Sequence, residues 1–123
     1  MTEPVEILRD AEQLALAATT EARRRTVLSR SYYAALHYLW AHPCAAEFSR
    51  QKERSIHRDL VQYLAQSSNR SVVHCAQLLI RLRGRRELAD YHLGDTITAA
   101  MAEESIEDAG EIIEEALLDY RSG

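Results

Sequence analysis

The 123-residue sequence contains little of what interrupts helices or links domains. It has two prolines, four glycines and no low-complexity stretch, whereas leucine, alanine, glutamate and arginine are abundant. Because proline and glycine disfavour helix interiors and these four residue types favour them, the composition predicts an all-α fold. A chain of this length is large enough to bury one hydrophobic core, so we expect a single domain over residues 1–123.

Cysteine and long apolar runs are also scarce. Cys44 and Cys75 lack CxxC spacing, which predicts reduced structural thiols rather than a disulfide framework or a zinc site. The histidines have no partner at metal-ligand spacing on one helix, so we expect no metal. No apolar run reaches the roughly 18 residues of a membrane span, and Met1–Asp10 is acidic rather than typical of a signal peptide. These absences predict a cytoplasmic protein that does not bind membranes.

Several catalytic motifs are missing. The sequence has no GxxxxGK[ST] phosphate loop, no GxGxxG after a strand and no GxSxG elbow. Nucleotide hydrolysis, dinucleotide redox chemistry and serine-hydrolase chemistry therefore lack their local parts, and we expect no cofactor.

Charge is distributed unevenly along the chain. Residues 21–86 carry 13 basic and four acidic side chains, whereas residues 95–123 carry one basic and nine acidic. Fourteen of the 15 basic residues are arginines, whose planar guanidinium suits phosphate oxygens, although a GC-rich genome produces the same bias. The basic half is therefore a candidate surface for a polyanion, and the acidic half would repel it.

Apolar periodicity and capping residues divide the chain into five helices with short connections, which predicts an antiparallel bundle. The expected helices run from an N-cap at Thr2 to near Thr20, from Ala22 to Ala41 before Pro43, from Ile56 to Gln66, from near Ser71 to Gly94, and from Thr98 to Tyr120, with residues 42–53 as a loop. The second and fourth helices are expected to bury Leu28, Tyr32, Ala35 and Leu39, and Val72, Cys75, Ala76, Leu79, Leu82 and Ala89.

An aromatic stretch lies within the second expected helix. Tyr33, His37 and Trp40 lie at helical spacing within the aromatic-rich run Tyr32–Trp40, and such a run is typical of core packing with locally satisfied polar tips. A pocket for a small molecule or nucleotide near these side chains is the alternative.

Four arginines fall within residues 81–86 of the fourth expected helix. Arg83 has Glu87 four residues later and Arg86 has Asp90, so each can form a helical ion pair. Arg86 also continues the buried stripe four residues beyond Leu82. Since an unpaired buried guanidinium costs several kcal/mol, Arg86 must pair there either with Asp90 or with an oxyanion of a ligand.

His92 follows six residues after Arg86. An imidazole exchanges protons near neutral pH and a guanidinium stabilises a phosphorane-like transition state, so the pair suffices in kind for metal-independent RNA cleavage by the 2′-hydroxyl. The two residues are about 120° apart on an ideal helix. Either the helix unwinds near Gly94, or Arg85 serves instead, or the two groups meet across a dimer. The alternative is that His92 is an ordinary surface histidine at a helix end.

Three segments together resemble the HEPN superfamily of small helical bundles, which occur in prokaryotic toxin–antitoxin and defence systems. They are Ser29–His37, Ile56–Leu60 and Leu79–Tyr91. The resemblance covers nearly the whole chain and implies a HEPN-like bundle. Many members are metal-independent endoribonucleases with an Arg, four to six residues and a His, brought together from two protomers.

This resemblance implies that Arg86 and His92 are the catalytic pair of a homodimer. RNA would be the partner, with Arg85, Arg83 and Arg30 holding its backbone.

The sequence also differs from one group of the superfamily. Where toxins paired with a minimal nucleotidyltransferase usually have a polar residue after the Arg and a Tyr two past the His, this chain has Glu87 and Gly94. The alternative function is therefore a non-catalytic HEPN adaptor, or the partner of a separately encoded nucleotidyltransferase-type antitoxin. In that case Asp90 pairs structurally with Arg86, and Tyr91 packs at an interface.

Overall fold

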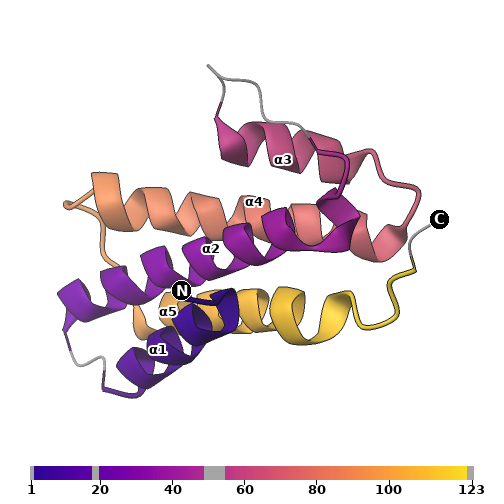
Figure 1. The fold of residues 1–123 in the computed structure, drawn as a ribbon. Helices are drawn as coiled ribbons and strands as arrows, with labels where there is room; N and C mark the ends of the chain where they lie inside the picture. Colours follow the sequence, from indigo (N-terminus) through magenta and orange to yellow (C-terminus); the bar gives the residue numbers. More distant parts are fainter. Residues whose placement is uncertain (1, 18–19, 49–54, 122–123) are drawn as a thin grey trace.

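A computed structural model describes residues 2–17, 20–48 and 55–121 of the chain, and over these ranges it is built of helices without a strand (Figure 1). The helices are α1 (Pro4–Leu16), α2 (Glu21–Ala41), α3 (Ile56–Ala65), α4 (Arg70–Tyr91) and α5 (Ala99–Gly110), with a short 3-10 turn η1 (Pro43–Ala45) and a π-helical turn η2 (Glu111–Ala116). The prediction of an all-α bundle of about five helices is confirmed.

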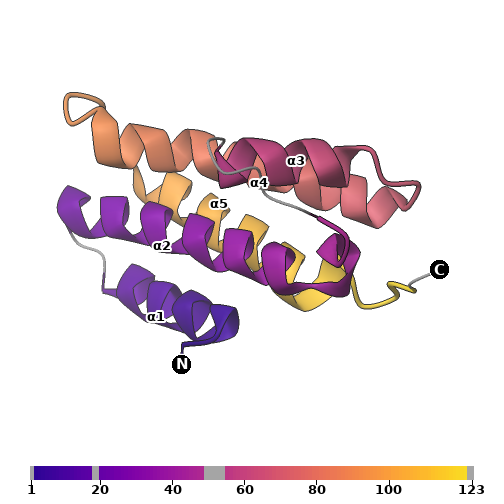
Figure 2. The ribbon, with the colours of Figure 1, turned by 45° about the horizontal axis from the view of Figure 1, so that its top comes forward.

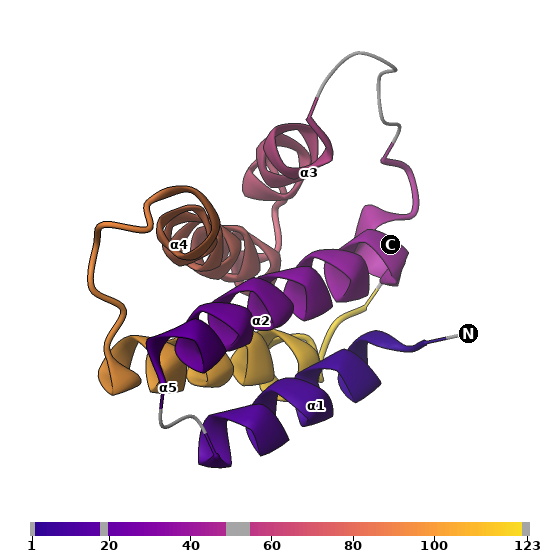
Figure 3. The same cartoon turned by 90° about the vertical axis from the view of Figure 1, so that its left-hand side faces the viewer.

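Helix α2 is the centre of the bundle. It packs against α1, α4 and α5, while α3 packs on α4 (Figure 2). Helices α1 and α2, α3 and α4, and α4 and α5 run antiparallel (Figure 1). Viewed from the side, α3 and α1 lie at opposite edges of the molecule, with α2 between them (Figure 3). One long side of α2 carries the exposed Tyr33 and Trp40, and no other helix of the described residues covers it (Figure 3).

The expected apolar stripes form the core. The buried residues of α2 include Leu28, Tyr32, Ala35 and Leu39, and those of α4 include Val72, Cys75, Ala76, Leu79, Leu82 and Ala89. A smaller cluster at one end of the bundle joins Val27, Leu28, Ala89, Ile97 and Ala102. Each fully buried leucine contributes about 1.5–3 kcal/mol of transfer free energy, so these stripes hold α2 against its neighbours.

Several helix ends differ from the sequence prediction. Glu3, not Thr2, is the N-cap of α1, and it makes no side-chain cap bond. Helix α1 ends at Leu16 rather than near Thr20, because the Thr20 hydroxyl accepts a hydrogen bond from the Arg23 amide (3.3 Å) and caps α2. Residues 18–19 lie outside the described part.

Two connecting regions also differ. Within the expected loop 42–53, Pro43 starts the turn η1, which buries Cys44; residues 49–54 lie outside the described part. The last expected helix is α-helical only to Gly110 and continues as η2, where Glu111 contacts His74 of α4. None of the described helices is long and apolar enough to cross a membrane.

Candidate functional site

The segments Ser29–His37 and Leu79–Tyr91 meet where α2 packs on α4. The Ser29 hydroxyl donates to Asp90 Oδ1 (2.6 Å), and Asp90 Oδ2 forms an ion pair with Arg86 Nε (2.8 Å). Arg86 Nη2 in turn donates to the Tyr33 hydroxyl (3.1 Å). A chain of polar contacts thus joins two motifs that lie more than 50 residues apart in the sequence.

Arg86 is surrounded by aromatic rings. Its guanidinium carbon lies 5.7 Å from the ring centroid of Tyr32, 5.5 Å from that of Tyr33 and 5.2 Å from that of Tyr91. Its side chain is 19% exposed. Although desolvation lowers the pKa of Arg86, the interactions with Tyr33, Tyr91 and Asp90 outweigh it and raise the pKa above its ordinary value. The site therefore holds a permanent cation that is partly open to solvent.

A buried histidine supports the floor of this site. The Tyr32 hydroxyl and His57 Nδ1 of α3 lie 3.2 Å apart, within hydrogen-bond distance, and both residues are buried. Burial, with a smaller contribution from the positive charge of Arg83, lowers the pKa of His57 to about 4. His57 is therefore neutral near pH 7, and it ties α3 to the ring beneath Arg86.

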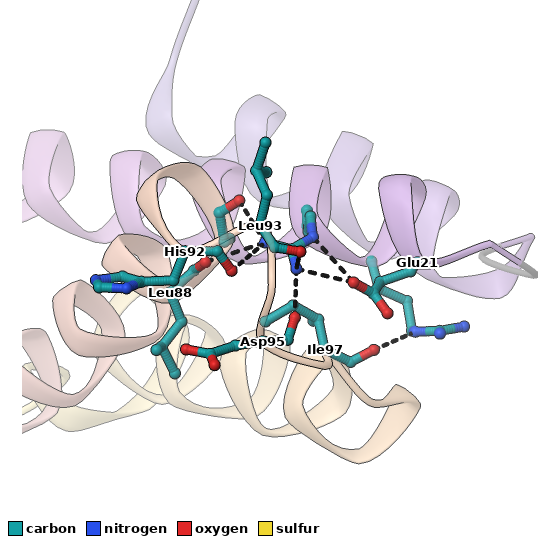
Figure 4. Close-up of polar contacts among 9 residues, drawn as sticks. Glu21, Leu88, His92, Leu93, Asp95 and Ile97 are labelled. Atoms are coloured by element: carbon teal, nitrogen blue, oxygen red, sulfur yellow. Dashed lines mark hydrogen bonds and ion pairs between the residues drawn. The ribbon is translucent and has the colours of Figure 1, made fainter.

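His92 stands at the end of α4. It is the C-cap residue, with φ −124° and ψ 70°, and its amide donates to the Leu88 carbonyl. Its side chain is exposed, and its ring points away from the polar contacts around Glu21 (Figure 4). Within the described part of this one chain, the imidazole makes no hydrogen bond or ion pair with Arg86. The α-helix ends at Tyr91, before Gly94.

Arg25 of α2 fixes the backbone around His92, a feature that the sequence reasoning missed. Its side chain is only 11% exposed and pairs with Glu21 Oε1 (2.8 Å). The guanidinium donates to five main-chain carbonyls of the α4 end and the following loop, those of Leu88 (3.0 Å), Ala89 (2.9 Å), His92 (3.3 Å), Leu93 (3.2 Å) and Asp95 (Figure 4). The last carbonyls of a helix lack the regular intrahelical partners; here the Leu88 and His92 carbonyls accept from the His92 and Asp95 amides. Arg25 adds a charged donor from a different helix to the Leu88, Ala89 and His92 carbonyls.

The neighbouring Arg24 extends this contact, since its Nε donates to the Ile97 carbonyl (2.7 Å) just before α5. One signal in the sequence points to Arg25. It lies three residues before Leu28 and seven before Tyr32, so it continues the buried stripe of α2 towards the N-terminus.

The three proposed backbone-binding arginines have different surroundings. Arg85 is 12% exposed; its Nη2 lies 2.9 Å from Asp108 Oδ2 of α5, and its Nη1 donates to the Ser105 hydroxyl (3.3 Å). Arg83 is more open and pairs with Glu87 at 3.3 Å. Arg30 is exposed on α2. Only Arg83 and Arg30 therefore have open side chains, whereas Arg85 ties α4 to α5.

The aromatic run of α2 is divided between core and surface. Tyr32 is buried and Tyr38 packs against the core, as predicted, but the prediction of core packing is wrong for Tyr33, His37 and Trp40. Tyr33 is 41% exposed and Trp40 38% exposed, and His37 between them is also exposed. The physical reason is that α1, α4 and α5 cover only part of the circumference of α2, so that no helix in the described ranges packs on this side.

No group of three potential metal ligands occurs among the described residues. A family model described as "HEPN domain" matches residues 6–119. This range includes all three segments on which the sequence resemblance rests. Comparisons with curated proteins and with solved structures give no match.

Proposed function

The chain belongs to the HEPN domain family, and from this premise we propose that it is a metal-independent endoribonuclease of a toxin–antitoxin or defence system, acting in the cytoplasm as a homodimer. The observation that carries the proposal is the arrangement at the end of α4. A permanently charged Arg86 lies in a partly open aromatic site, and the backbone of His92 is clamped by Arg25.

The two side chains have complementary roles in the proposed reaction. The 2′-hydroxyl attacks the adjacent phosphorus, the P–O bond to the 5′-oxygen breaks, and the products carry a 2′,3′-cyclic phosphate and a 5′-hydroxyl. His92 takes the proton of the 2′-hydroxyl or supplies one to the leaving oxygen. Arg86 stabilises the negative charge that develops on the phosphorane oxygens. This reaction needs no redox partner, and its atoms balance within the RNA strand.

A second protomer is part of the proposal because, among the described residues of one chain, the imidazole of His92 makes no hydrogen bond or ion pair with Arg86. Tyr91 and Leu93, which flank His92, are both largely exposed. Apolar side chains beside the site suit a contact with another copy, which would bring its own His92 towards Arg86. Arg83 and Arg30 would then hold the RNA backbone, while Arg85 remains paired with Asp108.

The decisive experiment is RNA cleavage in the presence of EDTA. We expect cleavage by the wild type and a loss of at least a hundredfold in His92→Ala and in Arg86→Lys, because a proton-transfer group and a bidentate cation are each worth about that factor or more. The matched control is His74→Ala, which removes an exposed histidine of the same helix that pairs with Glu111. Absence of cleavage by the wild type, or full activity of His92→Ala, would refute the proposal.

Mixing variants tests the shared site. An equimolar mixture of Arg86→Ala and His92→Ala chains should regain about a quarter of the wild-type rate, because half of randomly paired dimers are mixed and each mixed dimer holds one intact site. If both residues acted within one chain, the mixture would stay inactive.

A second candidate function is the non-catalytic adaptor that binds a nucleotidyltransferase. The observation that favours it is that Arg86 already forms an ion pair with Asp90 and lies against three tyrosine rings. An arginine with a purely structural role would have the same contacts. In this case Arg86→Ala should lower the melting temperature and disrupt assembly. The ribonuclease proposal instead expects lost cleavage by Arg86→Lys in a protein that still folds.

A further inference from the structure

The exposed side of α2 carries a continuous row of ring and cationic side chains. Arg30, Tyr33, His37 and Trp40 follow at intervals of three, four and three residues, which places them on one face of the helix. All four are exposed. The row extends about 15 Å along the helix axis at 1.5 Å per residue. We define it by these four residues as the α2 row.

The rings of the α2 row are already stacked on one another. The centroids of Tyr33 and His37 lie 6.2 Å apart and those of His37 and Trp40 lie 6.1 Å apart, each pair with an interplanar angle of 21°. At the other end, the guanidinium of Arg86 lies against the Tyr33 ring. The α2 row therefore begins at the proposed cleavage site and leads away from it along α2.

The charge around the α2 row favours an anionic strand. Glu21 is the only carboxylate of α2, and it pairs with Arg25 at the start of the helix. No carboxylate of α2 therefore accompanies Arg30 along the row. At the Arg86 end, Asp90 and Glu87 are paired with Arg86 and Arg83. A polyanion can approach this side of α2 without meeting an unpaired acid of α2.

We propose that the α2 row is a stacking platform for the bases of single-stranded RNA, with Arg30 and Arg86 contacting the backbone at the end nearest the cleavage site. This inference rests on the proposed function for its substrate class. Every base offers a π face, so stacking on exposed aromatic rings is tolerant of sequence, and cations beside the rings track the phosphates. Bases inside a duplex are stacked on one another, so the platform selects single strands.

The single tryptophan of the chain gives a direct probe of this surface. Trp40 is the only tryptophan in the sequence, so its fluorescence reports on the platform alone. With the His92→Ala variant, which keeps the RNA intact, a 12-nucleotide oligouridine should quench Trp40 emission saturably. The same RNA annealed to oligoadenosine should quench it far less.

A binding assay with labelled oligouridine tests the energetic role of the rings. In the His92→Ala background, Trp40→Leu should weaken binding about five- to a hundredfold, because one base-stacking ring has about that effect, and Trp40→Phe should restore part of it. The matched control is Leu16→Ala, an exposed apolar residue of α1 that should change binding less than twofold. Circular dichroism confirms that each variant is folded.

The possible outcomes distinguish the platform from an inert surface, from a contact between copies and from the nuclease itself. Equal quenching by single and double strands, or unchanged RNA affinity in Trp40→Leu, overturns the platform. So does a result in which Trp40→Leu dissociates the dimer while RNA affinity per chain is unchanged, because the row is then a contact between copies. Saturable quenching of Trp40 by single strands, without any cleavage by the wild type, supports the platform and refutes the nuclease. If the wild type cleaves RNA, Trp40→Leu cleaves it equally well and RNA does not quench Trp40, the nuclease is supported and the platform is refuted.

Discussion

Replacing Arg25 by methionine should detach the end of α4 from α2. The substitution keeps most of the aliphatic stem but removes every donor of the guanidinium. It therefore leaves the carbonyls of Leu88, Ala89 and His92 without their partner from α2. The loss is expected both in global stability and in the order of the segment that carries His92.

The magnitude follows from the burial of the contacts. The bonds to the Leu88 and Ala89 carbonyls are partly buried, so water replaces them poorly, and a hydrogen bond to a charged donor is worth about 1.5–3 kcal/mol. The remaining carbonyls lie at the surface, where water can take over. Both bonds come from Arg25 Nη1, and the Leu88 carbonyl keeps the bond from the His92 amide. The destabilisation is therefore expected at the lower end of the sum, about 3 kcal/mol, which corresponds to about 10 °C in Tm for a chain of this size.

Urea unfolding followed by circular dichroism measures this free energy. The matched control is Arg23→Met in the same helix turn, because Arg23 is exposed and, within the described ranges, its guanidinium donates only to the Ala17 carbonyl (3.2 Å). The control should lose less than about 0.5 kcal/mol. Hydrogen exchange should show faster exchange of the His92 amide in Arg25→Met. A loss no larger than that of Arg23→Met would refute the clamp.

Three further predictions concern stability. The pKa of His57, about 4, lies below the ordinary 6.5, so neutral His57 stabilises the fold fully above pH 6.5. This stabilisation is lost as the pH falls towards 4, at up to about 1.4 kcal/mol per pH unit. The urea midpoint of His57→Gln should therefore fall less from pH 7 to 5 than that of the wild type, and an equal fall in both proteins would contradict this. Asp108→Asn should lower the free energy of unfolding by about 2–4 kcal/mol, because it breaks a largely buried ion pair with Arg85. In the same urea assay, Arg9→Ala, which breaks an exposed ion pair, should lower it by less than about 0.5 kcal/mol. Gly84→Ala should stabilise α4 by about 0.5–1 kcal/mol, since an added Cβ meets nothing within 4 Å; a lower urea midpoint would show that this surface is not open.

The buried faces of α2 and α4 could be predicted from the sequence because helical periodicity reports directly on burial. Leu28 and Leu82 are buried where their stripes placed them. The ends of helices were predicted less well, since a cap depends on which local hydrogen bond forms. Thr20 illustrates this: the same residue suits the end of α1 and the start of α2, and only the bond from the Arg23 amide decides between them.

The surroundings of the candidate site could be predicted only in part. The i and i+4 spacing of Arg86 and Asp90 is visible in the sequence, and the structure places them 2.8 Å apart. The contacts of Tyr33 and Ser29 with this pair are not visible, because they join helices that are distant in the chain. The exposure of Trp40 was also hidden: an aromatic stripe has the same spacing whether or not a helix packs on it.

Counting basic side chains along the chain overstates the surface that RNA can meet. Arg24, Arg25 and Arg85 all fall in the basic half, yet their guanidinium groups bind carbonyls or carboxylates within the bundle. If Arg30, Arg83 and Arg86 are the cations that contact the backbone, three phosphates are neutralised per chain. The logarithm of the binding constant for single-stranded RNA should then fall with the logarithm of salt concentration with a slope of about −2. If all 13 basic side chains of residues 21–86 contacted phosphates, the slope would be about −9. Fluorescence titrations of His92→Ala with RNA at several salt concentrations therefore decide whether the site alone or the whole basic half binds the strand.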